Sequence, residues 1–319
     1  MIETHPLSNP IPTIRPRLNY SQRKITNGFM LAMTGALTIL ALAPLIWIIS
    51  YVLIKGSQYV TLSFFTQLPR PLGMEGGGVL NAIEGTLILS ILAAFFAIPP
   101  GILAAIYVAD HPNTPIGTAV RFSTDVLAGI PSIIVGLFGY ALVVKPQGHY
   151  SALAGGLVLA VIMLPIIIRT TEEMIKLVPR SLREGSLALG APEWKTKIRV
   201  VLPAAMNGII TGILLGLARA SGETAPLLFT ALGNERYEIG QIISGGIKGG
   251  QNPLTIINRI IEQPVDSLPL TLFKYSQQPY PERINQAWAA ALVLIGIVLL
   301  LNIIARIWVN YSSARLRGK

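Results

Sequence analysis

Six long apolar runs, separated by polar segments, dominate the pattern of the chain. Each run is continuous rather than alternating, which is typical of a helix, and each is long enough to cross the hydrocarbon layer of a bilayer. Only helices and closed barrels satisfy their backbone hydrogen bonds in lipid, so the pattern predicts an all-α integral membrane protein with six transmembrane helices. The predicted spans are residues 29–54, 83–109, 122–144, 152–175, 204–232 and 284–309.

The composition agrees with a membrane protein and narrows its chemistry. The chain is 52% hydrophobic and 13% charged, against roughly 25% charged residues in soluble domains. It has no cysteine, which excludes disulfides and thiolate chemistry, and its three histidines form no HExxH pair. No GxxxxGK[ST] pattern occurs, so the chain is not expected to hydrolyse ATP or to be an enzyme, and no cofactor or metal is predicted.

The distribution of basic residues predicts the orientation. Lys and Arg number 25 against 15 Asp and Glu, and they gather before the first span, in one inner loop and at the C-terminus. Because cytoplasmic segments carry the excess of Lys and Arg, both termini are expected in the cytoplasm. The predicted organisation is a cytoplasmic tail (1–28), a single transmembrane domain (29–311) and a second cytoplasmic tail (312–319).

Two loops are too long to be simple connections, the inner loop 176–203 and the outer loop 233–283. The outer loop is rich in Gly, Pro, Gln and Asn, with a short amphipathic helix expected near residues 256–262. Long loops in compact proteins are often binding surfaces, although a flexible tether is the alternative.

The inner loop contains VPRSLREGSLALGAPEWKTKIRVVLP at residues 178–203. Ser181 and Glu184 have capping-box spacing, which predicts a short helix beginning at Ser181. Gly190 suits the left-handed residue that ends such a helix, and Pro192 begins a second one. The pattern therefore predicts two short helices that meet at a glycine bend, with apolar side chains that need a partner surface (Leu182, Leu187, Leu189 and Trp194).

The same loop resembles the coupling motif of ABC importer permeases. Glu184, Gly190, Leu202 and Pro203 fall on the pattern Glu-Ala-Ala, three residues, Gly, nine residues, Ile-x-Leu-Pro, with Gly185-Ser186 and Val200 as mild departures. The resemblance implies the type I importer permease fold and a loop that docks on a cytoplasmic ATPase. The alternative for Glu184 is that it only completes the capping box.

Four further stretches are similar to permeases of phosphate-specific ABC importers: residues 129–140, 169–191, 217–233 and 287–306. The resemblance implies a permease that translocates inorganic phosphate across the cytoplasmic membrane. It also implies a homologous permease partner, two ATPase subunits that use the ATP, and an extracytoplasmic phosphate-binding protein. The alternatives are a permease for another oxyanion, such as sulfate or molybdate, and a membrane signalling subunit that reports phosphate status.

Arg219 and Glu223 lie inside the fifth apolar run, four residues apart, so on a helix they share one face. A charge at the centre of a bilayer costs roughly 2.5–3.5 kcal/mol, so the pair is expected to face protein or water. The planar fork of arginine suits a phosphate, and Glu223 can take the guanidinium when phosphate leaves. Gly222 would allow another backbone or the anion to approach closely, and Thr224 offers a hydroxyl. The alternative for the Arg219–Glu223 pair is a static salt bridge that packs the helix against its neighbours.

The other charges near the spans are given simpler interpretations. Asp125 is expected to act as a dipole partner or cap near the start of the third span, and Arg169 to extend its side chain to the lipid headgroups. Glu172 and Glu173 lie where the fourth span reaches the cytoplasm and are candidates for ATPase docking. Residues 129–132 interrupt a helix, either to line the pore or to form a packing kink.

Overall fold

The computed structural model describes residues 20–71, 74 and 76–317, and the chain divides into two compact units between Tyr51 and Val52. The first unit contains one helix, α1 (Tyr20–Gly56), whose last turn belongs to the second unit. The predicted first span is confirmed as helix, and it begins earlier, at Tyr20. Within the first unit the side chains of α1 (residues 20–51) are exposed and mostly apolar, as expected of a helix whose surroundings are lipid or another protein.

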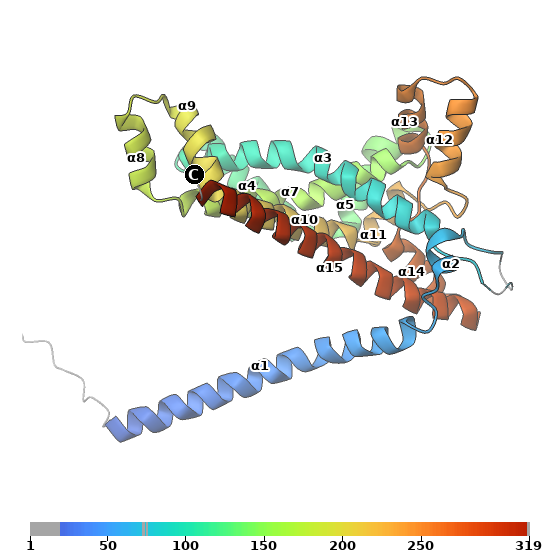
Figure 1. The fold of residues 1–319 in the computed structure, drawn as a ribbon, viewed down its shortest axis with the longest axis horizontal. Helices are drawn as coiled ribbons and strands as arrows, with labels where there is room; N and C mark the ends of the chain where they lie inside the picture. Colours follow the sequence, from blue (N-terminus) through green and yellow to red (C-terminus); the bar gives the residue numbers. More distant parts are fainter. Residues whose placement is uncertain (1–19, 72–73, 75, 318–319) are drawn as a thin grey trace, which may run out of the picture. The chain divides into compact units, whose positions relative to one another are not determined.

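The second unit is a bundle of long helices with short helices at both ends (Figure 1). Within the described residues no strand occurs, and the only β-type pairing is an isolated bridge between Leu232 and Val265. The elements are α2 (Leu62–Thr66), α3 (Leu80–Asp110), α4 (Pro115–Gly129), α5 (Ser132–Gly139), the π-helix η1 (Tyr140–Val144), α6 (Lys145–Gln147), α7 (Ala152–Lys176), α8 (Arg180–Ala188), α9 (Glu193–Thr196), the π-helix η2 (Lys197–Val201), α10 (Leu202–Ser221), α11 (Ala225–Thr230), α12 (Ile239–Lys248), α13 (Pro253–Glu262), α14 (Leu268–Ser276) and α15 (Pro281–Arg317).

The core of the bundle lies where α3 packs against α7, with α10 on both. The α3–α7 contact is made by small buried residues, Ala93 and Ala97 from α3 and Gly155 from α7. A Cβ on Gly155 would come within 2.7 Å of Leu89 Cδ2. Helices in lipid associate through close packing rather than through a hydrophobic force, so these small residues explain why α3 and α7 are central.

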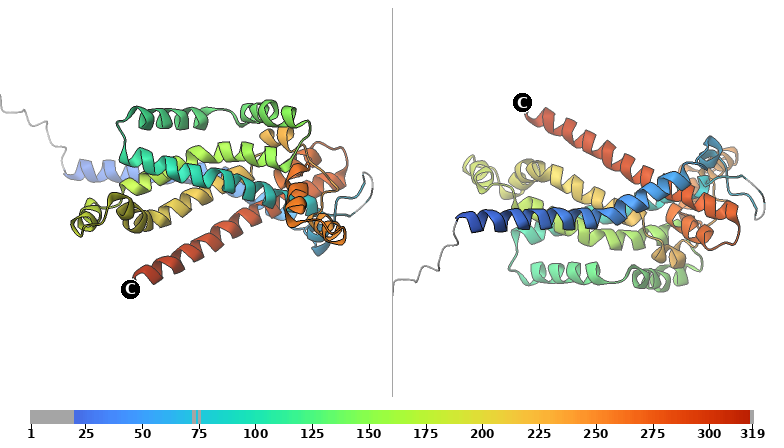
Figure 2. Two further views of the ribbon diagram at one scale, coloured as in Figure 1. Left: turned by 90° about the horizontal axis from the view of Figure 1, so that it is seen from above. Right: turned by 90° about the horizontal axis from the view of Figure 1, so that it is seen from below.

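By length and composition, five of the described helices could cross a membrane, or six if one bent pair counts as a single span. That pair is α4 with α5–α6, bent by 104°, so the prediction of one continuous helix over 122–144 is wrong. The break is at Ile130, whose φ/ψ of −73°/130° is extended, because the proline that follows disfavours the helical conformation for the residue before it. In Figure 2, α4 lies beside the bundle as a separate segment.

The fifth predicted span, 204–232, is also divided. The helix begins at Glu193, passes through η2 and ends at Ser221, and α11 follows as a separate helix. A continuous helix would need an N–H donated from residue 226 to the carbonyl of Gly222, and Pro226 has none. The helix therefore ends between Arg219 and Glu223, the two residues on which the functional hypothesis depends.

The short helices lie at the two ends of the long ones: α8 and α9 at one end, and α12, α13 and α14 at the other (Figure 1). The amphipathic helix expected near 256–262 is confirmed as α13. The glycine-rich sequence of the outer loop gave no indication of α12, in which Gly246 provides room for Ile256 of α13.

Candidate substrate and coupling sites

Arg219 and Glu223 form the expected ion pair across the end of a helix. Arg219 lies in the last turn of α10, whereas Glu223 follows the helix end at Gly222. The distance from Arg219 Nη2 to Glu223 Oε1 is 3.0 Å, and the side chains are 57% and 12% exposed, respectively. The expectation that both residues lie on one continuous helix is wrong, but the turn after Ser221 still brings their side chains together.

A cavity of about 260 Å³ opens beside Arg219. Its other walls are apolar except for Ser132, and they come from the α4–α5 break, from α7 and from α5 (Leu127, Ala128, Ile130, Ser132, Val135, Val161, Ile162, Pro165 and Ile166). Residues 129–132 were interpreted either as pore lining or as a packing kink, and the structure places Ile130 and Ser132 in the wall of this cavity. Arg219 is the one charged side chain among the residues that line this cavity, and its planar fork suits an anion that accepts two parallel hydrogen bonds.

The contacts of Gly222 and Thr224, the neighbours of the pair, do not assign a substrate role to either residue. A Cβ added to Gly222 would meet only the carbonyl oxygens of Ala218 and Arg219, both at 3.7 Å, so no other segment of the described chain approaches it closely. Thr224 precedes α11, and its side chain makes no capping hydrogen bond. The substrate roles of Gly222 and Thr224 stay predictions. Beside the pair, Ser221 is hydrogen-bonded to Ser90 of α3 at 3.1 Å between hydroxyl oxygens, a contact that sequence spacing did not indicate.

The inner loop forms the predicted pair of short helices, α8 and α9, called here the knuckle (residues 180–196). Gly190 takes the left-handed conformation with φ of +80°, as predicted. The capping-box prediction is wrong, because α8 begins at Arg180 directly after Pro179 and no side chain caps it. Glu184 is exposed and makes no hydrogen bond or ion pair within the described part of the chain, so the capping alternative for its role no longer applies.

The knuckle carries an uncovered apolar surface. Leu182, Leu187, Leu189 and Trp194 are all exposed, and Leu189 reaches 90%. Leu202 and Pro203 are half-buried at the start of α10, one turn after the knuckle. Pro203 cannot donate the N–H that an α-helix would need there, which explains the wider π-helical turn η2 immediately before it. Leu202 and Pro203 thus shape the junction between the knuckle and α10. The four apolar side chains form the exposed surface of the knuckle.

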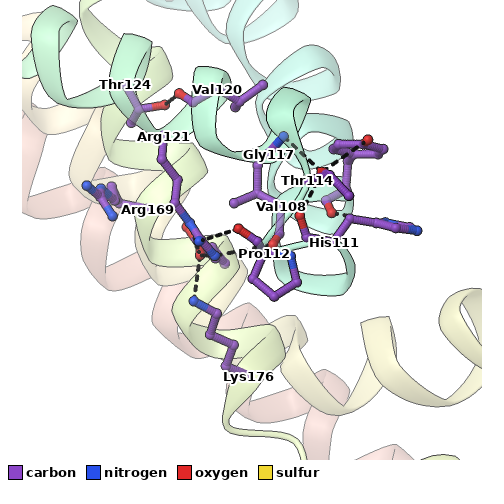
Figure 3. Close-up of polar contacts among 12 residues, drawn as sticks. Val108, His111, Pro112, Thr114, Gly117, Val120, Arg121, Thr124, Arg169 and Lys176 are labelled. Carbon is purple, nitrogen blue, oxygen red and sulfur yellow. Dashed lines mark hydrogen bonds and ion pairs between the residues drawn. The ribbon is translucent and has the colours of Figure 1, made fainter.

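An ion cluster centred on the buried Glu172 joins α4 to α7 (Figure 3). Glu172 of α7 accepts hydrogen bonds from Arg121 Nε at 3.0 Å and Nη2 at 2.6 Å, and Lys176 Nζ lies at 2.5 Å. Arg121 also donates to the carbonyls of Pro112 at 3.1 Å and Val108 at 3.3 Å. The Glu172 side chain is only 3% exposed, so its interpretation as a docking residue is wrong, while its neighbour Glu173 is exposed.

A second ion pair between the same helices joins Arg169 of α7 to Asp125 of α4. Arg169 therefore has a protein partner rather than extending alone to headgroups. Asp125 is not a cap either, because α4 begins at Pro115 with Thr114 as its N-cap, the Thr114 hydroxyl accepting from Gly117 N at 3.1 Å. The sequence interpretation placed the start of this helix too late, since Pro115 was not recognised as its first residue.

Comparisons with known proteins agree with this architecture. The family described as "Binding-protein-dependent transport system inner membrane component" matches residues 101–318. The phosphate transport system permease protein PstA of Yersinia pestis is 40% identical over 91% of this chain and 92% of its own length. The same-named protein of Mycobacterium leprae is 34% identical over 98% of both chains. The chain belongs to the PstA family of permeases.

Two solved structures show that this PstA-family chain has the fold of an ABC importer permease. A chain of the MetNI methionine ABC transporter has a TM-score of 0.55 at 18% identity, covering 73% of this chain and 95% of that one. A chain of a bacterial alginate ABC transporter has a TM-score of 0.54 at 16% identity, covering 92% and 97%. The PstA-family chain is accordingly a multi-pass protein of the inner membrane, and the predicted fold class is confirmed.

Proposed function

We propose that this PstA-family permease is the subunit of an ATP-driven ABC importer that carries inorganic phosphate across the cytoplasmic membrane. The observation that carries the proposal is that Arg219, 57% exposed, is the one charged side chain lining a cavity inside the bundle. A guanidinium inside a span is expensive unless it is paired or serves a polar ligand, and Arg219, although paired with Glu223, also lines the cavity. The names of the PstA relatives support phosphate as that ligand.

The asymmetric burial of the pair supports a switchable clamp. Glu223 is 12% exposed and held at the helix end, whereas the Arg219 side chain has room to move. In the proposed cycle the guanidinium leaves Glu223 to make two parallel hydrogen bonds to a phosphate, and it returns when the anion departs. The competing carboxylate keeps the anion from being held too tightly to leave.

The knuckle is proposed to dock on a cytoplasmic ATPase through its exposed apolar side chains, with Glu184 as a polar contact and Gly190 fixing the bend. Leu202 and Pro203 would carry its movement into α10. The proposed assembly contains a PstC-like homologous permease, two PstB-like ATPase subunits that use the ATP, and a PstS-like extracytoplasmic phosphate-binding protein. The protein itself needs no cofactor in this proposal.

The proposed orientation puts α8 and α9 in the cytoplasm and α12–α14 outside. The two sets of short helices lie at opposite ends of the spans, which is what this topology requires (Figure 1). Six crossings, with α4–α6 as one bent span, return the chain to its starting side, so both termini would be cytoplasmic. The basic residues of the knuckle favour the same orientation.

Uptake by the complex reconstituted in vesicles tests the proposal. The vesicles enclose ATP and carry the permease partner and the two ATPase subunits, and the phosphate-binding protein is added outside. Uptake of radiolabelled phosphate is compared with that of sulfate and molybdate. ATP-dependent accumulation of phosphate alone is expected. Accumulation of sulfate or molybdate in preference to phosphate would identify that oxyanion as the substrate in place of phosphate. The absence of any ATP-dependent uptake by an assembled complex would favour the signalling role instead.

A further inference from the structure

Asp110 is the last residue of α3, and its carboxylate is shared by two cations from the inner loop. Arg183 Nη1 of α8 lies 3.3 Å from Asp110 Oδ1, and Lys197 Nζ of η2 lies 2.9 Å from Oδ2. The Asp110 side chain is 11% exposed. One carboxylate thus holds α8 of the knuckle and the residue that directly follows the knuckle, which is braced internally by the Ser186–Thr196 hydroxyl pair at 2.8 Å.

The position of Asp110 is not explained by α3 itself. A carboxylate at the C-terminal end of a helix faces the negative end of the helix dipole, which is unfavourable. Arg183 and Lys197 supply the compensating charge. A cavity of about 340 Å³ lies beside this contact, lined by Asp110, His111, Leu187 and Glu193 among others. The ion cluster is the polar connection to α3, next to an apolar cluster in which Val178 and Val201 pack with Ile106 and Ala109.

The other side of the α3–α4 turn is held by Arg121. Its guanidinium donates to the carbonyls of Val108 and Pro112, which flank Asp110, and it also pairs with Glu172. Arg121 belongs to α4, a 15-residue helix about 22 Å long. The far end of α4 contributes Leu127 and Ala128 to the wall of the Arg219 cavity. A continuous series of contacts therefore runs from the knuckle to that cavity.

We propose that Asp110 is a positioning residue that transmits movement of the knuckle, through the α3–α4 turn and Arg121, to the α4 wall of the Arg219 cavity. The inference rests on the proposed function, in which the knuckle receives its movement from an ATPase. Rigid helices joined by ion pairs with discrete arrangements are suited to such transmission. Movement of the knuckle would thus reach the transmembrane helices by a second path, in addition to the direct one through Leu202 and Pro203.

The test uses Asp110→Asn in the full complex reconstituted in vesicles. Asparagine keeps the shape but loses the charge that holds both cations. ATP hydrolysed and phosphate taken up are measured per assembled complex. Hydrolysis is expected to persist while the phosphate carried per ATP falls roughly tenfold, within the usual range of coupling between sites. The control is Glu282→Gln, which removes one carboxylate charge at an exposed residue in the first turn of α15, outside the knuckle; its phosphate carried per ATP is expected to stay at the wild-type value.

Two further variants keep the test decisive if Asp110→Asn assembles poorly. Lys197→Met leaves Arg183 on Asp110 and is expected to lower the ratio partially, and Asp110→Glu, which keeps the charge, is expected to retain most of it. A merely structural role would lower complex yield and leave the ratio per assembled complex unchanged, which would overturn the inference. Failure of the wild-type complex to couple ATP hydrolysis to phosphate uptake would instead refute the proposed function.

Discussion

Replacing Arg219 by alanine is expected to lower phosphate uptake strongly while the complex still assembles. The substitution removes the cation that faces the cavity and leaves Glu223 without its partner at 3.0 Å. The remaining carboxylate then repels the anion that must pass. Arg219→Lys is expected to retain part of the activity, because it keeps the charge and loses the planar fork.

The magnitude follows from the charges. Two like unit charges about 4 Å apart repel by about 4 kcal/mol at an effective dielectric of 20, and by about 1 kcal/mol in bulk water. These two values bound the expected repulsion. Uptake per assembled complex should therefore fall by roughly fivefold to a thousandfold, since about 1.4 kcal/mol corresponds to a factor of ten.

The assay measures complex yield and phosphate uptake side by side in Arg219→Ala, Arg219→Lys, Glu223→Gln and the double variant that exchanges the two residues. Glu223→Gln should bind the anion and release it slowly, because the guanidinium has lost its alternative partner. A static salt bridge predicts a different result: each single change lowers yield, and the exchange restores both yield and transport. Uptake per assembled complex near the wild-type value in Arg219→Ala would refute the clamp.

Three other predictions test separate parts of the structure. Gly190→Pro should insert in the membrane but lose copurification of the ATPase, because proline cannot adopt the φ of +80°, and wild-type copurification with normal transport would contradict this. A cysteine at Gln251 should react with an impermeant maleimide added outside intact cells, while one at Lys195 should not; the reverse labelling would invert the topology. Asp266 is 2% exposed, and this burial raises its pKa even though Lys274 lies 3.5 Å away and acts in the opposite direction. The folded state therefore favours the protonated form of Asp266. Wild-type thermal stability should therefore decline as the pH rises from the ordinary aspartate pKa through the raised one, and Asp266→Asn should flatten that decline; an unchanged slope in the variant would contradict the assignment.

The corrections to the sequence interpretation have a common physical cause. Glu172 was interpreted as a docking residue because it lies near the end of a span, and its burial depends on Arg121, 51 residues away along the chain. Asp125 and Arg169 were interpreted one at a time, although they pair with each other between α4 and α7. A charge in a span needs a partner, but the sequence does not show which of several charges supplies it. Helix packing makes that choice.

The sequence by itself determined the class of the protein and its local structure. Long apolar runs require helices in lipid, and the glycine at 190 and the prolines at 192 and 203 specify the knuckle and its junction, since these residues restrict the backbone wherever they occur. The tertiary structure alone decided that the α4–α5 break meets Arg219 at one cavity and that Asp110 receives both Arg183 and Lys197. These arrangements depend on contacts between helices far apart in sequence, which are set by how closely small residues on α3 and α7 allow the helices to approach.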